Sequence, residues 1–111
     1  MAAYLESGHG LWTLEAGGSP VGFLGVNGDE LAALFVDPNA HRKGYGRALT
    51  RHALAQGATR LKVNEGNPGA RAFYERMGFL AVGRAETDDA GRPYPLILMA
   101  LPRDGLRPHR T

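Results

Sequence analysis

Cysteine is absent from the 111 residues of this chain, so the sequence provides neither a disulfide framework nor a thiolate ligand for a metal. No apolar run approaches the roughly 20 residues that a membrane-spanning helix requires. The N-terminus lacks the basic stretch, apolar segment and small-residue cleavage site of a signal peptide. Together these absences predict a cytoplasmic protein without a membrane segment.

A concentrated block of positive charge is also missing. The formal net charge is only +2, and the basic residues are scattered along the chain, which argues against nucleic-acid binding. Arg42, Lys43 and Arg47 flank one glycine-bearing turn, and this arrangement favours a small polyanionic ligand. The histidines at positions 9, 52 and 109 lie far apart in the sequence and form no helical pair, so we expect no metal site.

The length of the chain and its ordinary composition, 43% hydrophobic and 22% charged, predict one domain over residues 1–101. Residues 11–15 and 21–26 are predicted to be two strands, and the turn-forming residues 16–20 between them indicate a β-hairpin. The segment 30–36 is nearly continuous in apolar residues, as is typical of a central strand covered on both faces. Residues 102–111 have no apolar face and are predicted to form a disordered tail.

Two helices are predicted after the strand 30–36. The first covers residues 46–56, and the strand predicted at 60–64 would complete a parallel crossover. The second has Asn67 as its cap, Pro68 in its first turn and Gly78 beyond its end. A final pair of strands is predicted at 79–86 and 94–101. This order of elements indicates an α/β (α+β) fold.

The turn between the strand 30–36 and the first helix is the most informative segment. It reads Arg42, Lys43, Gly44, Tyr45, Gly46 and Arg47. Backbone N–H groups at such a turn, together with the positive end of the helix dipole, bind phosphate oxygens. Two glycines at this spacing would also suit an ordinary tight connection between a strand and a helix that binds no ligand. Two other phosphate-binding motifs are excluded, because the turn lacks the third glycine of a dinucleotide-binding fold and the Gly-Lys-Ser or Gly-Lys-Thr of a P-loop.

The run from His41 to Gly46 resembles the pyrophosphate-binding signature of the GNAT superfamily of N-acetyltransferases, although the family usually has Gln or Arg where His41 stands. Residues 64–79 resemble the family's second motif, in which Asn, Ala, Tyr and Gly-Phe recur. The resemblance covers about residues 11–101, and residues 88–95 look like small bacterial YjaB-type protein-lysine acetyltransferases. It implies a mixed central sheet with flanking helices, whose parallel strands 30–36 and 60–64 splay apart to admit pantetheine.

The resemblance also implies roles for individual residues. Acetyl-CoA would be the acyl donor, and a primary amine of a small molecule or a protein lysine would be the acceptor. The amides of residues 42–47 would hold the pyrophosphate, and the Asn67 side chain would contact the cofactor arm. Tyr74 matches the family's general-acid tyrosine, and Glu30 occupies a position where some members carry a glutamate base. The expected oxyanion donors are the backbone N–H groups of Leu34, Phe35 and Val36.

Several alternatives stay open at this point. Tyr74 could be a core tyrosine, and Glu30 an ordinary charged residue beside a turn. The whole chain could be a non-catalytic acyl-CoA-binding or assembly module, or a general nucleotide-phosphate binder. Family members usually begin with a strand and one or two helices, yet only ten residues precede Leu11. That shortness would leave the strand 11–15 as an exposed edge, which predicts pairing in a homodimer.

Overall fold

The computed structural model describes residues 2–40 and 44–102, and these form seven strands and two α-helices. The chain divides after Thr59 into two compact units. The first contains β1–β4 and α1, and the second contains β5–β7 and α2. A single domain over residues 1–101 therefore stays a prediction. Apart from Pro102, the predicted tail lies outside the described residues.

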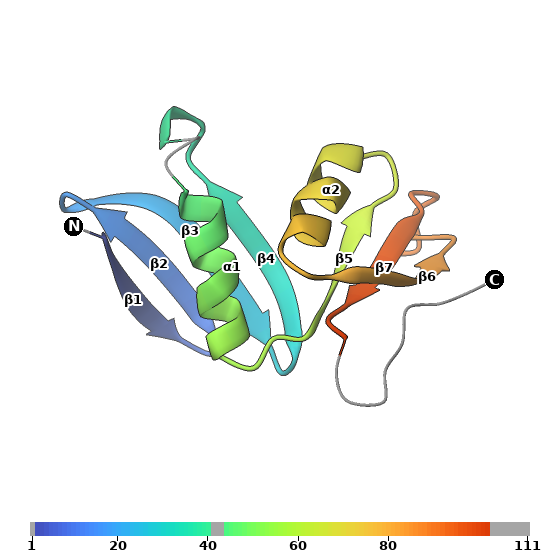
Figure 1. Cartoon of the computed structure of the whole chain (residues 1–111), viewed down its shortest axis with the longest axis horizontal. Helices are drawn as coiled ribbons and strands as arrows, with labels where there is room; N and C mark the ends of the chain where they lie inside the picture. Colours follow the sequence, from blue (N-terminus) through green and yellow to red (C-terminus); the bar gives the residue numbers. More distant parts are fainter. Residues whose placement is uncertain (1, 41–43, 103–111) are drawn as a thin grey trace. The chain divides into compact units, whose positions relative to one another are not determined.

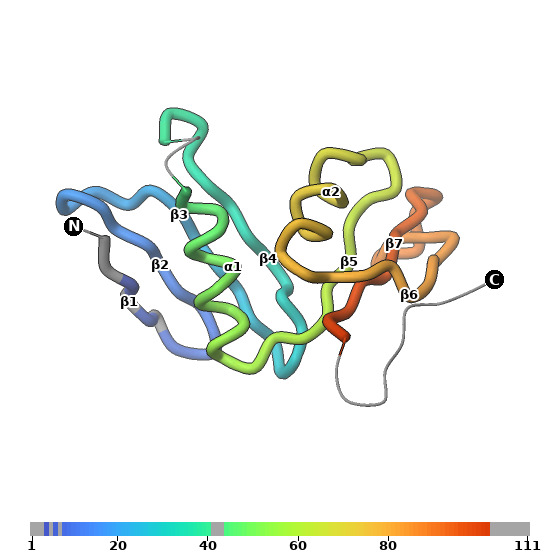
Figure 2. Tube along the Cα trace, in the orientation of Figure 1, coloured from blue at the N-terminus to red at the C-terminus, as the bar shows by residue number. Residues whose placement is uncertain are grey.

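The strands of the first unit follow one another as an antiparallel meander (Figures 1 and 2). Tight turns make the connections, and the turn residues His9 and Gly10 both have positive φ values, 56° and 77°. Two such residues between paired strands suit a two-residue hairpin, whose twist matches that of the strands. The strands are β1 (Ala2–Gly8), β2 (Leu11–Ala16), β3 (Ser19–Asn27) and β4 (Glu30–Val36).

The strand β1 was not predicted, and its presence corrects one expectation. It pairs with β2 along nearly its whole length, with Tyr4 opposite Leu14 and Glu6 opposite Trp12. The prediction that residues 11–15 form an exposed edge is therefore wrong, because β1 occupies that edge. The argument for a homodimer through β2 is lost with it.

Helix α1 (Tyr45–Ala55) packs against β3 and β4 and covers one face of the first unit's strands (Figure 1). The contact is close because a Cβ built on Gly22 would lie 2.7 Å from Cδ1 of Leu49. Leu14, Leu24, Leu49 and Ala53 are fully buried between the helix and the strands. Each buried leucine contributes about 1.5–3 kcal/mol to folding, so this core fixes the position of the helix.

Within the first unit, the face of β4 that points away from α1 carries exposed aromatic side chains. Phe35 is 58% exposed, and its cross-strand neighbour Phe23 is 37% exposed. The first unit alone leaves this face open, so the expectation that strand 30–36 is covered on both faces stays a prediction. A run of apolar residues shows that a strand is apolar on both sides, but it does not show what lies against each side.

The second unit is built around β7, which pairs antiparallel with both β5 and β6. Its elements are β5 (Arg60–Asn64), α2 (Pro68–Arg76), β6 (Leu80–Ala85) and β7 (Leu96–Ala100). These bounds agree closely with the predicted ones. Phe79 is fully buried and Met99 is 1% exposed, so they anchor the core of this unit. The predicted parallel pairing of β4 with β5 would join the two units and stays a prediction.

Candidate active site

The N-terminus of α1 has the features of an anion-binding site. Gly44 is its N-cap, in the left-handed conformation with φ 78°, and no side chain caps the helix. The first turn contains no acidic residue. The amides of Tyr45, Gly46 and Arg47 therefore lie where a helix has no internal acceptors and where its dipole is positive. Phosphate oxygens are the natural partners of such amides.

Residues His41, Arg42 and Lys43 lie outside the described residues, so the predicted contribution of their amides and side chains stays a prediction. The part of the turn that is described is well fixed. The Gly44 carbonyl accepts a hydrogen bond of 3.0 Å from the Ala48 amide, and the buried Thr50 hydroxyl donates one of 2.8 Å to the Gly46 carbonyl. These bonds hold the first turn of α1 in one conformation.

The hydrogen bonds of β4 show that the amides of the three predicted oxyanion donors do not all point to the same edge of the strand. The Asp37 amide donates to the Val21 carbonyl at 2.9 Å, and the register places Phe35 opposite Phe23. Because the N–H groups of an antiparallel strand point alternately to its two edges, the Phe35 amide points to β3. The amides of Leu34 and Val36 point to the opposite edge of β4. Phe35 is thus a poor candidate for a donor, whereas the other two keep the required orientation.

Glu30 begins β4, where it is half-buried and pairs with Asn27 across the β3–β4 turn. Val36 lies six positions further along the strand, and at about 3.3 Å per residue this distance is roughly 20 Å. The structure therefore does not bring Glu30 close to the anion-binding end of α1. A base at this position would act far from the pyrophosphate, at the remote end of the strand.

The predicted cap of α2 is present. The Asn67 Oδ1 accepts a hydrogen bond of 3.0 Å from the Ala70 amide, and Pro68 is the first helical residue. Only the carbonyl oxygen of the side chain is used in this cap, so the side-chain NH₂ group retains its donor capacity. Asn67 can therefore end the helix and bind a ligand at the same time.

Tyr74 lies on the second half of α2, and other aromatic rings surround it. Its ring packs edge-on against Phe73 and Phe79, at centroid distances of 5.1 and 5.9 Å. Burial raises the pKa of the Tyr74 phenol above its ordinary value of 10.0, so the hydroxyl stays protonated near neutral pH. A protonated, half-buried phenol has the state that a general acid needs.

Two acidic residues of the β6–β7 loop, Asp88 and Asp89, form hydrogen bonds and ion pairs. The Asp88 carboxylate accepts hydrogen bonds from the Ala90 and Arg92 amides and from the Arg92 guanidinium, at 3.0, 2.8 and 2.7 Å. Asp89 forms an ion pair of 2.9 Å with Lys62. Asp88 therefore stabilises its own turn, while Asp89 and the 54% exposed Tyr94 lie on the surface of the loop.

The predicted site residues divide between the two units. Glu30 and residues 34–47 belong to the first, and Asn67 and Tyr74 belong to the second. Within residues 2–40 and 44–102 no group of three or more histidine, aspartate or glutamate side chains could hold a metal ion. In the same ranges no helix is long and apolar enough to cross a membrane.

Comparison with known families now identifies the chain. The family model described as an acetyltransferase (GNAT) domain matches residues 7–80. This chain belongs to the GNAT acetyltransferases. Members of this family use acetyl-CoA as their acyl donor, a ligand whose pyrophosphate suits the helix N-terminus described above.

Individual GNAT relatives agree with this assignment. Peptidyl-lysine N-acetyltransferase YjaB from Salmonella typhimurium is 47% identical over 85 residues, which are 75% of this chain and 58% of the relative. The solution structure of apo-form YjaB from Escherichia coli superposes with a TM-score of 0.74 at 42% identity, covering 81% of this chain and 63% of that one. The predicted GNAT fold is thereby confirmed.

A further structural relative is the ribosomal-protein-S18-alanine N-acetyltransferase from Escherichia coli. It has a TM-score of 0.62 at 29% identity and covers 94% of this chain and 74% of the other. The chain spans little more than half the length of the YjaB proteins that it matches, 58% and 56%.

Four residues that sequence reasoning missed, Glu6, Trp12, Val26 and Gln56, line a pocket at the far end of α1. Their meeting depends on β1, which was not predicted. The turn formers Gly8 and Gly10 directly before the predicted strand 11–15 are the sequence signal that could have indicated a hairpin partner on the N-terminal side.

Proposed function

We propose that this chain transfers an acetyl group from acetyl-CoA to a primary amine, and that the amine is a lysine side chain of a protein. The N-terminus of α1 is the observation that carries the proposal. It has no side-chain cap, no acidic residue in its first turn and a left-handed Gly44 before it. The names of the relatives, peptidyl-lysine N-acetyltransferases, favour lysine as the acceptor.

Each residue has one task in the proposed reaction. The amides of Tyr45, Gly46 and Arg47 hold the pyrophosphate, with those of Arg42, Lys43 and Gly44 completing the turn. The NH₂ group of Asn67 donates to the cofactor arm. These contacts hold the thioester in a fixed position for attack by the neutral amine. Fixing one reactant in this way lowers the entropy cost of bringing the two reacting atoms together.

Attack of the amine nitrogen on the thioester carbonyl forms the new C–N bond and places negative charge on the carbonyl oxygen. The outward-pointing amides of Leu34 or Val36 stabilise this charge. When the C–S bond breaks, the Tyr74 hydroxyl gives its proton to the departing thiolate. The proton lost by the amine passes through water to Glu30 or to bulk solvent, and the Tyr74 phenolate regains a proton from solvent before the next turnover.

Calorimetric titration with acetyl-CoA, beside ATP and NAD as controls, tests the cofactor assignment. We expect acetyl-CoA to bind and the two controls to bind at least about tenfold more weakly, because they lack the pantetheine arm. Preference for ATP or NAD would contradict the proposal.

Turnover is measured by release of the CoA thiol in the presence of a lysine peptide. A thiol reagent reports released CoA alone, because the protein itself has no cysteine. Acetylated peptide, identified by mass, is the expected product. Binding of acetyl-CoA without any acetylated amine would show instead a non-catalytic acyl-CoA-binding module.

A further inference from the structure

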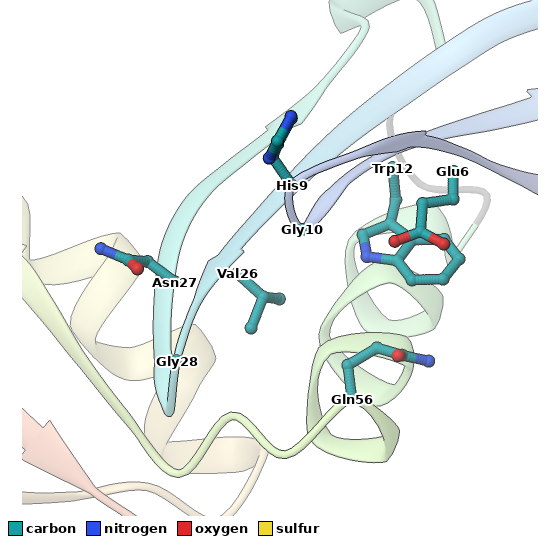
Figure 3. Close-up of a pocket in the computed structure, with 8 residues that line it drawn as sticks. All are labelled: Glu6, His9, Gly10, Trp12, Val26, Asn27, Gly28 and Gln56. Atoms are coloured by element: carbon teal, nitrogen blue, oxygen red, sulfur yellow. The ribbon is translucent and has the colours of Figure 1, made fainter.

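A pocket of about 320 Å³ lies at the C-terminal end of α1, between that end and the β1–β2 and β3–β4 turns (Figure 3). The proposed pyrophosphate site is at the other end of the same helix. Eleven residues, each rising about 1.5 Å, separate the two ends of α1 by roughly 16 Å. The pocket is therefore distinct from the site proposed for the pyrophosphate of CoA, and all its lining residues belong to the first unit.

Glu6 and Trp12 form one wall of this pocket. They are directly opposite each other on β1 and β2, so their side chains lie side by side on one face of the sheet. That face is the one covered by α1, because the Trp12 ring makes an edge contact with His52 at a centroid distance of 4.3 Å. An exposed carboxylate thus lies beside an indole ring at the end of the helix.

His52, which the Trp12 ring contacts, also packs against a second aromatic ring. His52 stacks on Tyr4 with centroids 4.0 Å apart and an interplanar angle of 5°. Burial lowers the pKa of His52 below 6.5, and the nearby Glu6 carboxylate opposes this shift without cancelling it. His52 is therefore neutral near pH 7 and places no positive charge behind the pocket.

The remaining walls also favour a cation with an apolar stem. The negative end of the α1 dipole points at this region. The Gln56 side chain supplies an amide oxygen, Val26 supplies an apolar surface, and no lysine or arginine is among the lining residues that the structure describes. Figure 3 shows the His9 side chain extending away from α1, so its imidazole does not enter the space beside Glu6.

We propose that this pocket binds a primary alkylammonium group, carried either by a free diamine or by a lysine side chain. The ammonium pairs with the Glu6 carboxylate and the Gln56 amide oxygen, and the methylene stem packs on Trp12 and Val26. An ammonium near an indole face gains additional electrostatic attraction. This site goes beyond acetyl transfer and does not depend on it.

The chain offers a direct reporter, because Trp12 is its only tryptophan. Its fluorescence is followed during titration with n-butylammonium, 1,5-diaminopentane and Nα-acetyl-lysine N-methylamide at constant ionic strength, with neutral n-butanol as the control. We expect a saturable change with the ammonium compounds and none with n-butanol. Tighter binding of the diamine or of the lysine amide identifies which source the pocket prefers.

Substitution of Glu6 tests the geometry. Glu6→Gln should weaken ammonium binding about three- to fivefold, the size expected for an exposed ion pair. Glu15→Gln removes the same charge from β2 at a position that does not line the pocket, and it should bind as the wild type does. Unfolding of both variants by heat checks that the fold is kept.

Three results would overturn the proposal: an equal response to n-butanol, a change that never saturates, or unaltered binding by Glu6→Gln. Since the readout is fluorescence, a protein that fails to acetylate any amine can still show this site. Acetyl-CoA binding should be unaffected in Glu6→Gln, which separates the pocket from the cofactor site.

Discussion

Removal of the Tyr74 hydroxyl gives the sharpest test of the proposed general acid. In Tyr74→Phe the ring keeps its contacts with Phe73 and Phe79, at 5.1 and 5.9 Å between centroids. No apolar contact is lost, so the free energy of unfolding should change by at most about 1 kcal/mol. Loss of a general acid lowers turnover about 10²–10⁴-fold, and at about 1.4 kcal/mol per tenfold this raises the barrier by about 3–6 kcal/mol.

The pH dependence follows from the direction of the pKa shift. Burial raises the pKa of Tyr74 above 10.0, so the fold favours the protonated phenol. The contribution of this preference to stability is complete below pH 10.0 and is lost as the pH rises through the higher folded-state pKa. Tyr74 should therefore cause no alkaline decline of kcat below that pH.

The assay is single-turnover acetylation of a lysine peptide, because a slow product release in the steady state could hide the chemical step. Calorimetry should give the same acetyl-CoA affinity for Tyr74→Phe and the wild type. Tyr94→Phe removes a hydroxyl from a 54% exposed tyrosine and serves as the matched control. A wild-type single-turnover rate in Tyr74→Phe, with acetyl-CoA bound, would refute the assignment.

Five further substitutions, at four positions, test the helix cap, a close backbone approach and the β6–β7 turn. Asn67→Ala removes the helix cap and should lower the free energy of unfolding, measured by thermal unfolding, by about 0.5–2 kcal/mol. Asn67→Asp keeps the cap but loses the NH₂ donor, so calorimetry should show weaker binding of acetyl-CoA. Gly10→Ala places a Cβ 2.1 Å from a β3 carbonyl oxygen and should cost about 2–4 kcal/mol. Gly17→Ala, at a similar positive φ in open space, should cost about 1–2 kcal/mol, and equal losses in denaturant unfolding would contradict the steric argument. Asp88→Asn should speed hydrogen exchange of the Ala90 amide, and unaltered exchange would show that the carboxylate does not hold the turn.

Much of the fold could be predicted where local chemistry fixes it. Asn67, Pro68 and Gly78 mark the ends of α2, and the structure confirms Asn67 as its cap and Pro68 as its first residue. The strand Glu30–Val36 was predicted to the residue because turn formers lie on both sides of it.

Features that depend on distant partners could not be predicted in the same way. The strand β1 exists because it pairs with β2, and its residues Ala2, Ala3 and Gly8 have little strand preference of their own. The exposure of Phe35 depends on what covers β4, and no local pattern reports that. The uncapped amides of α1 could be predicted from the sequence. The register with β3 was needed to show that the Phe35 amide points to β3, whereas the amides of Leu34 and Val36 point to the opposite edge of β4.

The turn held by Asp88 has a consequence for how this protein can diversify. One carboxylate receives hydrogen bonds from two backbone amides and a guanidinium within its own loop, so the shape of the loop is specified by Asp88 and Arg92. Asp89 and Tyr94 lie on its exposed surface, where Asp89 pairs with Lys62 at 2.9 Å and the Arg92 guanidinium lies 5.9 Å from the centre of the Tyr94 ring. Because the Asp88 carboxylate holds the loop backbone, new side chains at these two positions leave its hydrogen bonds to the Ala90 and Arg92 amides in place. This gives the chain a surface on which selectivity can change while the scaffold stays the same.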